Sequence, residues 1–189
     1  MTAPPPAASV AIRDAADADL AAITDIYAHH VRFGLGSFEE VPPSLEEIAR
    51  RRGDVVARKL PYLVAVTAAG AVRGYAYAAP YRARSAYRFS VEDSVYVAPD
   101  AGRQGIGRRL VAELIERCTQ AGWRQMVAVI GDSGNLASIA LHDQLGFRHA
   151  GVLTAIGFKH GRWVDTVLMQ REMGEGAAIP RGGPPPLSE

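Results

Sequence analysis

The chain has 189 residues, of which 48% are hydrophobic, and its 21 Lys and Arg nearly balance 20 Asp and Glu, so the formal net charge is +1. This length is typical of one domain that buries roughly 70% of its unfolded surface in a core of its own. The lack of a basic excess argues against a nucleic-acid or membrane-surface binder. The single cysteine, Cys118, excludes an internal disulfide and a cysteine-rich zinc site, which indicates the cytoplasm as the default compartment.

Both ends of the chain are biased in composition. Residues 1–9 contain three consecutive prolines without the features of a signal peptide, and residues 174–189 are rich in proline and glycine. Such segments have too little apolar surface to offset the entropy of ordering them, so we expect two mobile tails. The folded domain is therefore predicted to span residues 10–173. No apolar stretch in the sequence is long enough to cross a membrane.

The hydrophobic pattern alternates between strand and helix spacing along this domain. Strands are predicted over residues 10–13, 62–67, 72–79, 91–97, 126–130, 151–159 and 163–171. Helices are predicted after Asp14 to Asp17, after Ser44, and over residues 104–120 and 135–145. The continuous apolar run at 126–130 predicts a strand that is buried on both faces. The order β α α β β β α β α β β indicates an α/β fold, a mixed sheet covered by helices.

A glycine-rich turn, Gly102-Arg103-Gln104-Gly105-Ile106-Gly107, connects a predicted strand to a helix. The unpaired amides at the start of a helix, together with a glycine backbone that a ligand can approach closely, favour a diphosphate. The spacing differs from the dinucleotide fingerprint and from the P-loop. Arg103, Arg108 and Arg109 add positive charge beside the turn. The alternative is a plain tight connection between strand and helix.

Several motifs follow one another in a characteristic order. They are Val91–Val97, Gly105-Ile106-Gly107, Val127–Ile130, Asn135–Phe147 and Gly157–Trp163. In these motifs, from Ile12 to Gln170, the chain resembles the GCN5-related N-acetyltransferases (GNAT), in particular the branch that acetylates phosphinothricin, methionine sulfone or methionine sulfoximine. The resemblance implies a mostly antiparallel central sheet and direct transfer of acetyl from acetyl-CoA, within a ternary complex, to the α-amino group of a small amino acid analogue. We also expect a homodimer.

The resemblance further implies where acetyl-CoA binds. The backbone of Val95, Tyr96 and Val97 would contact the pantetheine arm, and an amide near Val95 would hold the oxyanion. The pyrophosphate would lie on the amides of the glycine-rich turn: Arg103, Gln104, Gly105, Ile106, Gly107 and Arg108. Gly102 departs from the family, which usually has Gln or Arg at this position; either a side-chain contact is lost or Arg103 and Gln104 substitute for it, and the backbone donors remain in both cases. Asn135 is either a helix N-cap or an additional contact to the coenzyme.

Two side chains are candidates for proton transfer. Glu92 lies in an apolar strand, where burial raises the pKa of a carboxyl and makes it a better base. Its alternative role is an ion pair with Arg84 or Arg88, whereas the resemblance implies that Glu92 deprotonates the substrate amine. His142 is either packed between helix and sheet or, as the resemblance implies, a proton carrier at the coenzyme thiol, with acid and base roles both open.

The segment Tyr81 to Tyr87 combines arginines with aromatic residues just before the Glu92 strand. It is either a solvated loop or, as the resemblance implies, the place of the amino acid substrate, with Phe38, Arg82, Arg84 and Tyr87 as its contacts. The other histidines lack the spacing of metal ligands, so no metal is expected. Cys118 falls on the apolar stripe of a helix and is predicted to be a core thiol. Alternative functions are acetylation of a polyamine or protein N-terminus, and noncatalytic binding of acyl-CoA.

Overall fold

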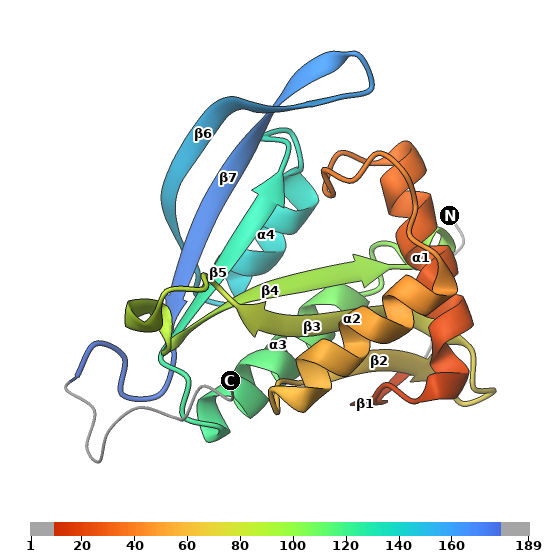
Figure 1. Ribbon diagram of the computed structural model, residues 1–189, viewed down its shortest axis with the longest axis horizontal. Helices are drawn as coiled ribbons and strands as arrows, with labels where there is room; N and C mark the ends of the chain where they lie inside the picture. The colour runs from red at the N-terminus through yellow and green to blue at the C-terminus, as the bar shows by residue number, and fades with distance from the viewer. Residues whose placement is uncertain (1–9, 179–189) are drawn as a thin grey trace, which may run out of the picture.

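The computed structural model describes residues 10–178, which form seven strands and four α-helices (Figure 1). The strands are β1 Val10–Asp14, β2 Tyr62–Thr67, β3 Val72–Pro80, β4 Ser90–Val97, β5 Gln125–Gly131, β6 Arg148–Lys159 and β7 Arg162–Glu172. The helices are α1 Leu20–Phe33, α2 Leu45–Ala57, α3 Ile106–Gln120 and α4 Leu136–Gln144. The predicted order of elements is confirmed. No helix within residues 10–178 is long and apolar enough to span a membrane.

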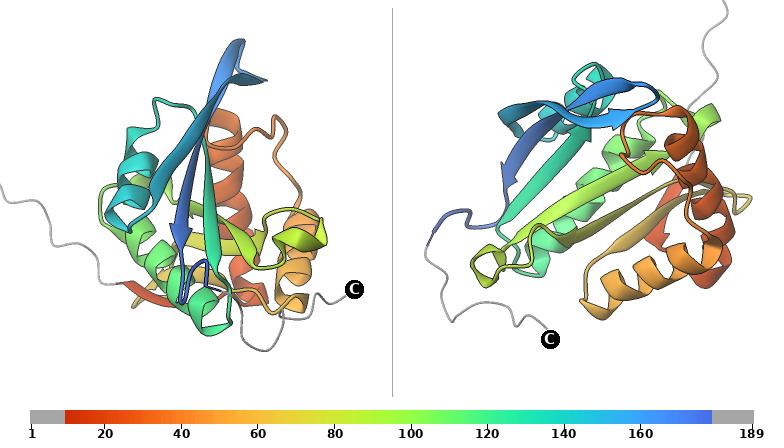
Figure 2. Two further views of the ribbon diagram at one scale, coloured as in Figure 1. Left: turned by 90° about the vertical axis from the view of Figure 1, so that its left-hand side faces the viewer. Right: turned by 45° about the horizontal axis from the view of Figure 1, so that its top comes forward.

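The seven strands form one mixed sheet in the order β1-β2-β3-β4-β5-β7-β6. Only β4 and β5 run parallel, and the other neighbouring strands are antiparallel. Figure 2 shows α1 and α2 on one face of the sheet and α3 and α4 on the other. The predicted α/β class, with a mostly antiparallel sheet flanked by helices, is therefore confirmed.

Capping residues set several helix boundaries as the sequence predicts. The Ser44 side chain accepts a hydrogen bond from the Glu47 amide at the start of α2, and Asn135 caps α4 in the same way. Helix α1 begins later than predicted, because the residues after β1 first form a short 3₁₀ turn, Asp17–Asp19. Gly146 follows α4 with a φ of +80°, a conformation that glycine adopts without strain.

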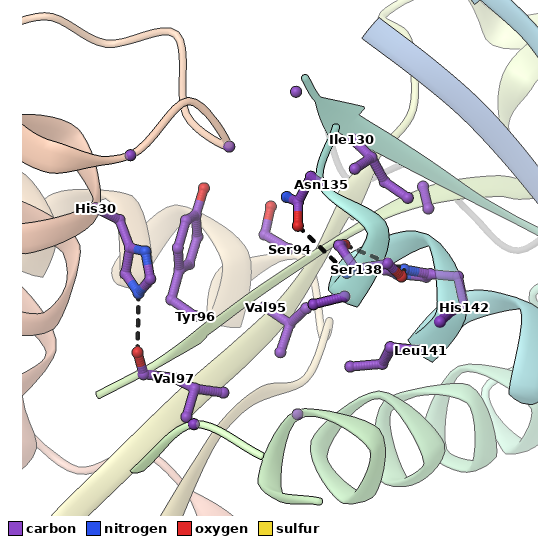
Figure 3. Close-up of a pocket in the computed structure, with 18 of the residues that line it drawn as sticks. His30, Ser94, Val95, Tyr96, Val97, Ile130, Asn135, Ser138, Leu141 and His142 are labelled. Atoms are coloured by element: carbon purple, nitrogen blue, oxygen red, sulfur yellow. Dashed lines mark hydrogen bonds between the residues drawn. The ribbon is translucent and has the colours of Figure 1, made fainter. Parts of the chain in front are cut away.

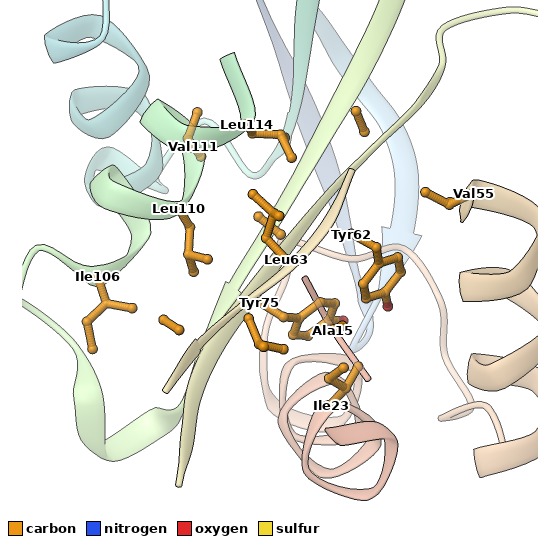
Figure 4. Close-up of a cluster of buried hydrophobic side chains, with 14 of the residues drawn as sticks. Ala15, Ile23, Val55, Tyr62, Leu63, Tyr75, Ile106, Leu110, Val111 and Leu114 are labelled. Atoms are coloured by element: carbon orange, nitrogen blue, oxygen red, sulfur yellow. The ribbon is translucent and has the colours of Figure 1, made fainter. Parts of the chain in front are cut away.

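The hydrophobic core lies on both faces of the sheet, and Figure 4 shows part of it, including the side chains of α3 that pack on the sheet. Leu110 and Leu114 of α3 pack over β2 and β3, where Leu63 is fully buried. Cys118 is fully buried on the same helix, so the predicted core thiol is confirmed. On the opposite face, tyrosines of β2, β3 and β4 stack on one another beneath α1 and α2.

The ends of the described region differ from the predicted domain boundary. Residues 174–178, which were expected to belong to a mobile tail, form turns, and Glu175 makes a 2.8 Å ion pair with Arg124. A local ion pair and backbone hydrogen bonds thus continue beyond β7, and the domain boundary at residue 173 stays a prediction. The predicted tail at residues 1–9 and the rest of the C-terminal one, residues 179–189, lie outside the described residues.

The two parallel strands separate part-way along their length. Ser90–Asp93 of β4 pair with Gln125–Ala128 of β5, and the strands diverge beyond that point. The prediction that β5 is buried on both faces is wrong, because Val129 is 38% exposed. Val129 lines a cavity at the gap between the two strands.

Candidate active site

A cavity of about 850 Å³ lies where β4 and β5 diverge. Its walls are the second half of β4, the end of β5, the start of α3 and one side of α4 (Figure 3). It brings together all the residues predicted to bind acetyl-CoA except Gln104: Val95, Tyr96, Val97, Arg103, Gly105, Ile106, Gly107, Arg108 and Asn135. Residues that are far apart in the sequence thus form one continuous surface.

The start of α3 forms a backbone cradle at this cavity. Arg103 and Gly105 have φ angles of +60° and +73°, which turn the chain sharply into the helix. Gly107 lets α3 approach α4 closely, since an added Cβ would lie 2.9 Å from Leu141 Cδ1. The free amides and positive dipole end of α3, with arginines beside them, suit a pyrophosphate. A Cβ added at Gly102 would meet nothing within 4 Å, so this position borders open space.

Beyond Asp93, the edge of β4 that faces β5 has no strand partner, so its backbone groups are available to a ligand in the cavity. At the end of this strand, His30 Nε2 donates a 2.8 Å hydrogen bond to the Val97 carbonyl. Burial lowers the pKa of His30 and so favours its neutral form. His30 thereby links α1 to the cavity wall, and no motif in the sequence indicates this contact.

Glu92 lies on β4 just before the strands diverge. Burial, and then the negative charge of Asp93, raise the pKa of Glu92 to about 7, while the positive charge of Arg82 acts in the opposite direction. Within the described residues Glu92 forms no ion pair with Arg84 or Arg88, so the alternative role considered from the sequence is not observed. A carboxyl with this pKa is well suited to accept a proton near neutral pH.

His142 is buried against Asp93 rather than against Glu92. Its Nε2 lies 3.1 Å from Asp93 Oδ2, and its Nδ1 donates to the Ser138 carbonyl at 2.7 Å. Burial lowers the pKa of His142, but the hydrogen bond and charge of Asp93 more than offset this, so the pKa is raised. Sequence reasoning missed Asp93, although it directly follows Glu92 in the strand.

The two proton-transfer candidates lie on opposite faces of β4, because successive strand residues point to opposite sides. Glu92 shares its face with Tyr96, which packs edge-on against Tyr27 of α1. Asp93 shares its face with Val95, which lies beside α3. The structure therefore places His142 of α4 against Asp93 on one face of β4 and Glu92 on the other face of the same strand.

The predicted substrate residues divide between two segments (Figure 1). Phe38 belongs to the α1–α2 connection, and its ring packs against Gly157 of β6 and near Gly131 at the end of β5. Arg82, Arg84 and Tyr87 belong to the β3–β4 connection, near the start of β4, and are exposed. This segment bends and forms a 3₁₀ turn at Ser85–Tyr87. Arg82 and Arg84 therefore do not lie side by side on one extended strand, because β3 ends at Pro80 and the turn follows soon after.

A polar network beneath the α1–α2 connection was also missed from the sequence. The Tyr27 hydroxyl bonds with Ser37 and Glu39, and Arg51 of α2 pairs with Glu39 at 2.6 Å. The buried ammonium of Lys159 donates a 2.6 Å hydrogen bond to the Ser37 carbonyl. These contacts hold the connection over the sheet. They join residues that are far apart in the sequence, so no local motif predicts them.

The comparisons with known proteins agree with this geometry. The profile described as "Acetyltransferase (GNAT) domain" matches residues 12–168. The chain belongs to the GNAT acetyltransferases. It is an acetyl-CoA-dependent N-acetyltransferase, and the features of the cavity fit acetyl-CoA: an unpaired strand edge for an extended arm and a helix N-terminus for a pyrophosphate. Within the described residues no cluster of side chains suits a metal ion.

Named relatives of this GNAT enzyme act on small amino acid analogues. It is 58% identical to phosphinothricin N-acetyltransferase of Alcaligenes faecalis, over 87% of this chain and 83% of the relative. It is 44% identical to an L-methionine sulfoximine/L-methionine sulfone acetyltransferase of Pseudomonas paraeruginosa, over 86% and 94%. A crystal structure of a Sinorhizobium meliloti phosphinothricin acetyltransferase with acetyl-CoA superimposes with a TM-score of 0.90 at 50% identity, covering 94% of this chain and 96% of that one.

Proposed function

We propose that this enzyme acetylates the α-amino group of a small amino acid analogue of the phosphinothricin, methionine sulfone or methionine sulfoximine type. The observation that carries the proposal is Glu92, a half-buried carboxyl beside the gap between β4 and β5 with a pKa of about 7. The names of the relatives supply the substrate class. Their similarity extends over most of this chain.

In this mechanism Glu92 accepts a proton from the substrate ammonium, directly or through one water, because only the neutral amine is a nucleophile. The amine nitrogen then forms a bond with the acetyl carbon, and the bond from that carbon to the coenzyme sulfur breaks. A backbone amide of β4 near Val95 holds the developing oxyanion. His142 acts from the other face of β4, on the departing sulfur.

The pocket for the amino acid is proposed to lie on the Glu92 face of the sheet. Arg82 is the better placed of the two candidate arginines, since its positive charge lowers the pKa of Glu92 and therefore reaches the same region. An amino acid brings a carboxylate, and a guanidinium suits two-pronged binding of that group. Arg84 and Tyr87 would extend this side of the pocket, and Phe38 would close it near the end of β5.

The proposal is tested by release of free thiol from acetyl-CoA in the presence of an amine panel. The panel contains phosphinothricin, methionine sulfone, methionine sulfoximine, a polyamine and a peptide with a free N-terminus. We expect the three amino acid analogues to be acetylated with the highest kcat/KM. A preference for the polyamine or the peptide would overturn the substrate class, and thiol release with none of them would overturn the proposed function.

We further propose that two copies associate through the β6–β7 hairpin. Its exposed apolar side chains form the hairpin patch: Val152, Leu153, Ile156, Phe158 and Trp163. The strand β6 is also the free edge of the sheet. Exposed apolar side chains that gather on one element favour an interface. The expected location of the enzyme, the cytoplasm, stays a prediction.

A further inference from the structure

The pair formed by Asp93 and His142 is the most buried polar feature of the site. The side chains of His142 and Asp93 are only 2% and 1% exposed. They come from α4 and β4, and both border the cavity. Buried charged groups are retained only when they are paired, so the pairing defines the state of both residues.

The hydrogen bonds of the ring determine how many protons it carries. The Ser138 carbonyl only accepts, so Nδ1 must carry a hydrogen to make its 2.7 Å contact. The 3.1 Å contact between Nε2 and Asp93 Oδ2 needs a second hydrogen, since a neutral ring protonated at Nδ1 would place a lone pair against the carboxylate. Both hydrogen bonds of the ring therefore form only when the Asp93–His142 pair carries one proton more than a neutral imidazole and an ionised carboxylate would carry together.

The surroundings favour keeping this extra proton on the ring. Within the described residues, Asp93 Oδ1 is buried without a hydrogen-bond partner, so His142, which contacts Oδ2, is the cation that can pair with this carboxylate. The titratable groups around the pair are Cys118 of α3 and Glu92, the neighbour of Asp93 on β4. Burial, and then Asp93, raise the pKa of the Cys118 thiol to about 12, so it stays neutral and supplies no positive charge. An imidazolium is the partner that the isolated carboxylate requires.

We propose that Asp93 is a positioning residue that keeps His142 as an imidazolium in the resting enzyme, so that His142 enters the reaction as an acid and not as a base. This deepens the proposed function and rests on it. When the bond between the acetyl carbon and sulfur breaks, its electron pair goes to sulfur, and the Nε2 proton of His142 can follow it to give the thiol. The new amide nitrogen loses its remaining excess proton, and the pair regains one, so each turnover releases one proton overall.

The charge state of His142 is measured first in the wild-type enzyme, by long-range ¹H–¹⁵N correlation spectra over a pH series. The His142 signals are assigned by their loss in His142→Gln. We expect both ring nitrogens to stay protonated at pH values above 6.5, the ordinary pKa of a histidine, and the titration midpoint to fall by about one pH unit or more in Asp93→Asn, as when a charge partner is lost. A neutral His142 ring at pH 6 in the wild type would overturn the proposal without any kinetic measurement.

The pH dependence of kcat then tests the role in turnover. An acid must be protonated, so its activity is lost as the pH rises through its pKa, and removing Asp93 lowers that pKa. The alkaline limb of the kcat profile should therefore move to lower pH by about one unit in Asp93→Asn, with a smaller change in the KM for acetyl-CoA. The matched control is Asp143→Asn, an exposed carboxylate at the next position of α4, which should leave the profile unchanged.

The spectra and the pH profile together distinguish a failure of this proposal from a failure of the proposed function. If the wild type acetylates its substrate but the alkaline limb does not move in Asp93→Asn, the positioning role is overturned and the acetyltransferase activity stands. If no amine is acetylated, the spectra of the wild type still determine whether His142 is an imidazolium. If Asp93→Asn fails to fold, Asp93→Glu replaces it: this variant should retain the imidazolium signals, and loss of those signals in a folded Asp93→Glu would count against the proposal.

Discussion

At the scale of single residues, the site depends on two neighbouring carboxyls of β4 that have different surroundings. Glu92 faces α1 and α2 and has a raised pKa, whereas Asp93 faces α3 and α4 and binds a histidine. In the proposed mechanism, the two faces of β4 would therefore serve separate proton transfers: the amine would lose its proton on the Glu92 face, and the sulfur would gain one on the Asp93 face.

Replacing Glu92 with Gln keeps the shape of the side chain and removes the base. We expect turnover to fall by roughly 100-fold or more, the range for loss of a general base, while acetyl-CoA binding stays near wild type. In the wild type, activity should rise as the pH passes through about 7, the pKa of Glu92, because the deprotonated form is the active one. Steady-state kinetics between pH 5 and 9 provide the measurement, and unchanged turnover in Glu92→Gln would assign deprotonation to another group.

The same substitution should change stability in a pH-dependent way. The folded-state pKa of Glu92 lies above the ordinary value of 4.5, so the unfolded chain loses this proton at lower pH than the folded one. The contribution of Glu92 to stability therefore falls as the pH rises from about 4.5 to 7. Thermal unfolding should show Glu92→Gln to be more stable than the wild type at pH 8, with a smaller difference at pH 5. If the difference in stability between Glu92→Gln and the wild type is the same at pH 5 and pH 8, burial does not raise the pKa of Glu92.

Arg82 offers a second prediction at this scale. Lys keeps the charge but loses the planar guanidinium, so Arg82→Lys should raise the KM for the amino acid several-fold and leave the KM for acetyl-CoA nearly unchanged. A substrate with an amidated carboxylate should be poor for the wild type and lose little more in the variant. If the amide is used as well as the free acid, Arg82 does not bind the carboxylate. Arg84→Lys serves as the comparison from the same connection.

At the scale of elements, residue patterns within short segments predicted the helices, the strands and their caps. Spacing within short segments predicted the Ser44 cap, the helix with buried Cys118 and the order of helices and strands along the chain. What could not be predicted depends on pairing between distant segments. The contact of Asp93 with His142 and the buried Lys159 under the α1–α2 connection arise only once the sheet has formed. The bend after Pro80 was missed because residue type alone does not show where a connection turns.

The α1–α2 connection is held over the sheet by glycines that leave room for it. A Cβ at Gly131 would overlap with the Leu35 carbonyl and come within 3.0 Å of the Phe38 ring. We therefore expect Gly131→Ala to lower the free energy of unfolding by about 1–3 kcal/mol, as overpacking does, and to raise the KM for the amino acid. Denaturant unfolding and steady-state kinetics measure the two effects.

The matched control is Gly53→Ala in the exposed face of α2. An added Cβ there meets nothing within 4 Å. Alanine is the better helix former, so this variant should be more stable by about 0.5–1 kcal/mol, with unchanged kinetics. If Gly131→Ala behaves like Gly53→Ala, the connection is not packed against β5 in solution.

At the scale of the whole molecule, β6 is the element that the fold leaves least covered. It lies at the edge of the sheet, and Phe158 and Trp163, which face each other across the hairpin, are 57% and 65% exposed. The register of β6 shifts twice along its pairing with β7. Such irregularities disfavour strand-to-strand pairing at a free edge, so a second copy is expected to pack its side chains against the face of the hairpin rather than extend the sheet.

A charge placed in the centre of this face should separate the two copies. We expect Trp163→Glu to be monomeric at concentrations where the wild type is dimeric, with association weakened by about a hundredfold or more, since burying an unpaired carboxylate costs roughly 3 kcal/mol or more. The control Val56→Glu changes an exposed apolar residue of α2, away from the hairpin patch, and should stay dimeric. Light scattering after gel filtration gives the mass of each variant.

Because Phe38 packs on Gly157 of the same hairpin, the monomer should also bind the amino acid more weakly while its KM for acetyl-CoA changes little. A wild type that is already monomeric, or a dimer that persists in Trp163→Glu, would place the contact between copies elsewhere or remove it.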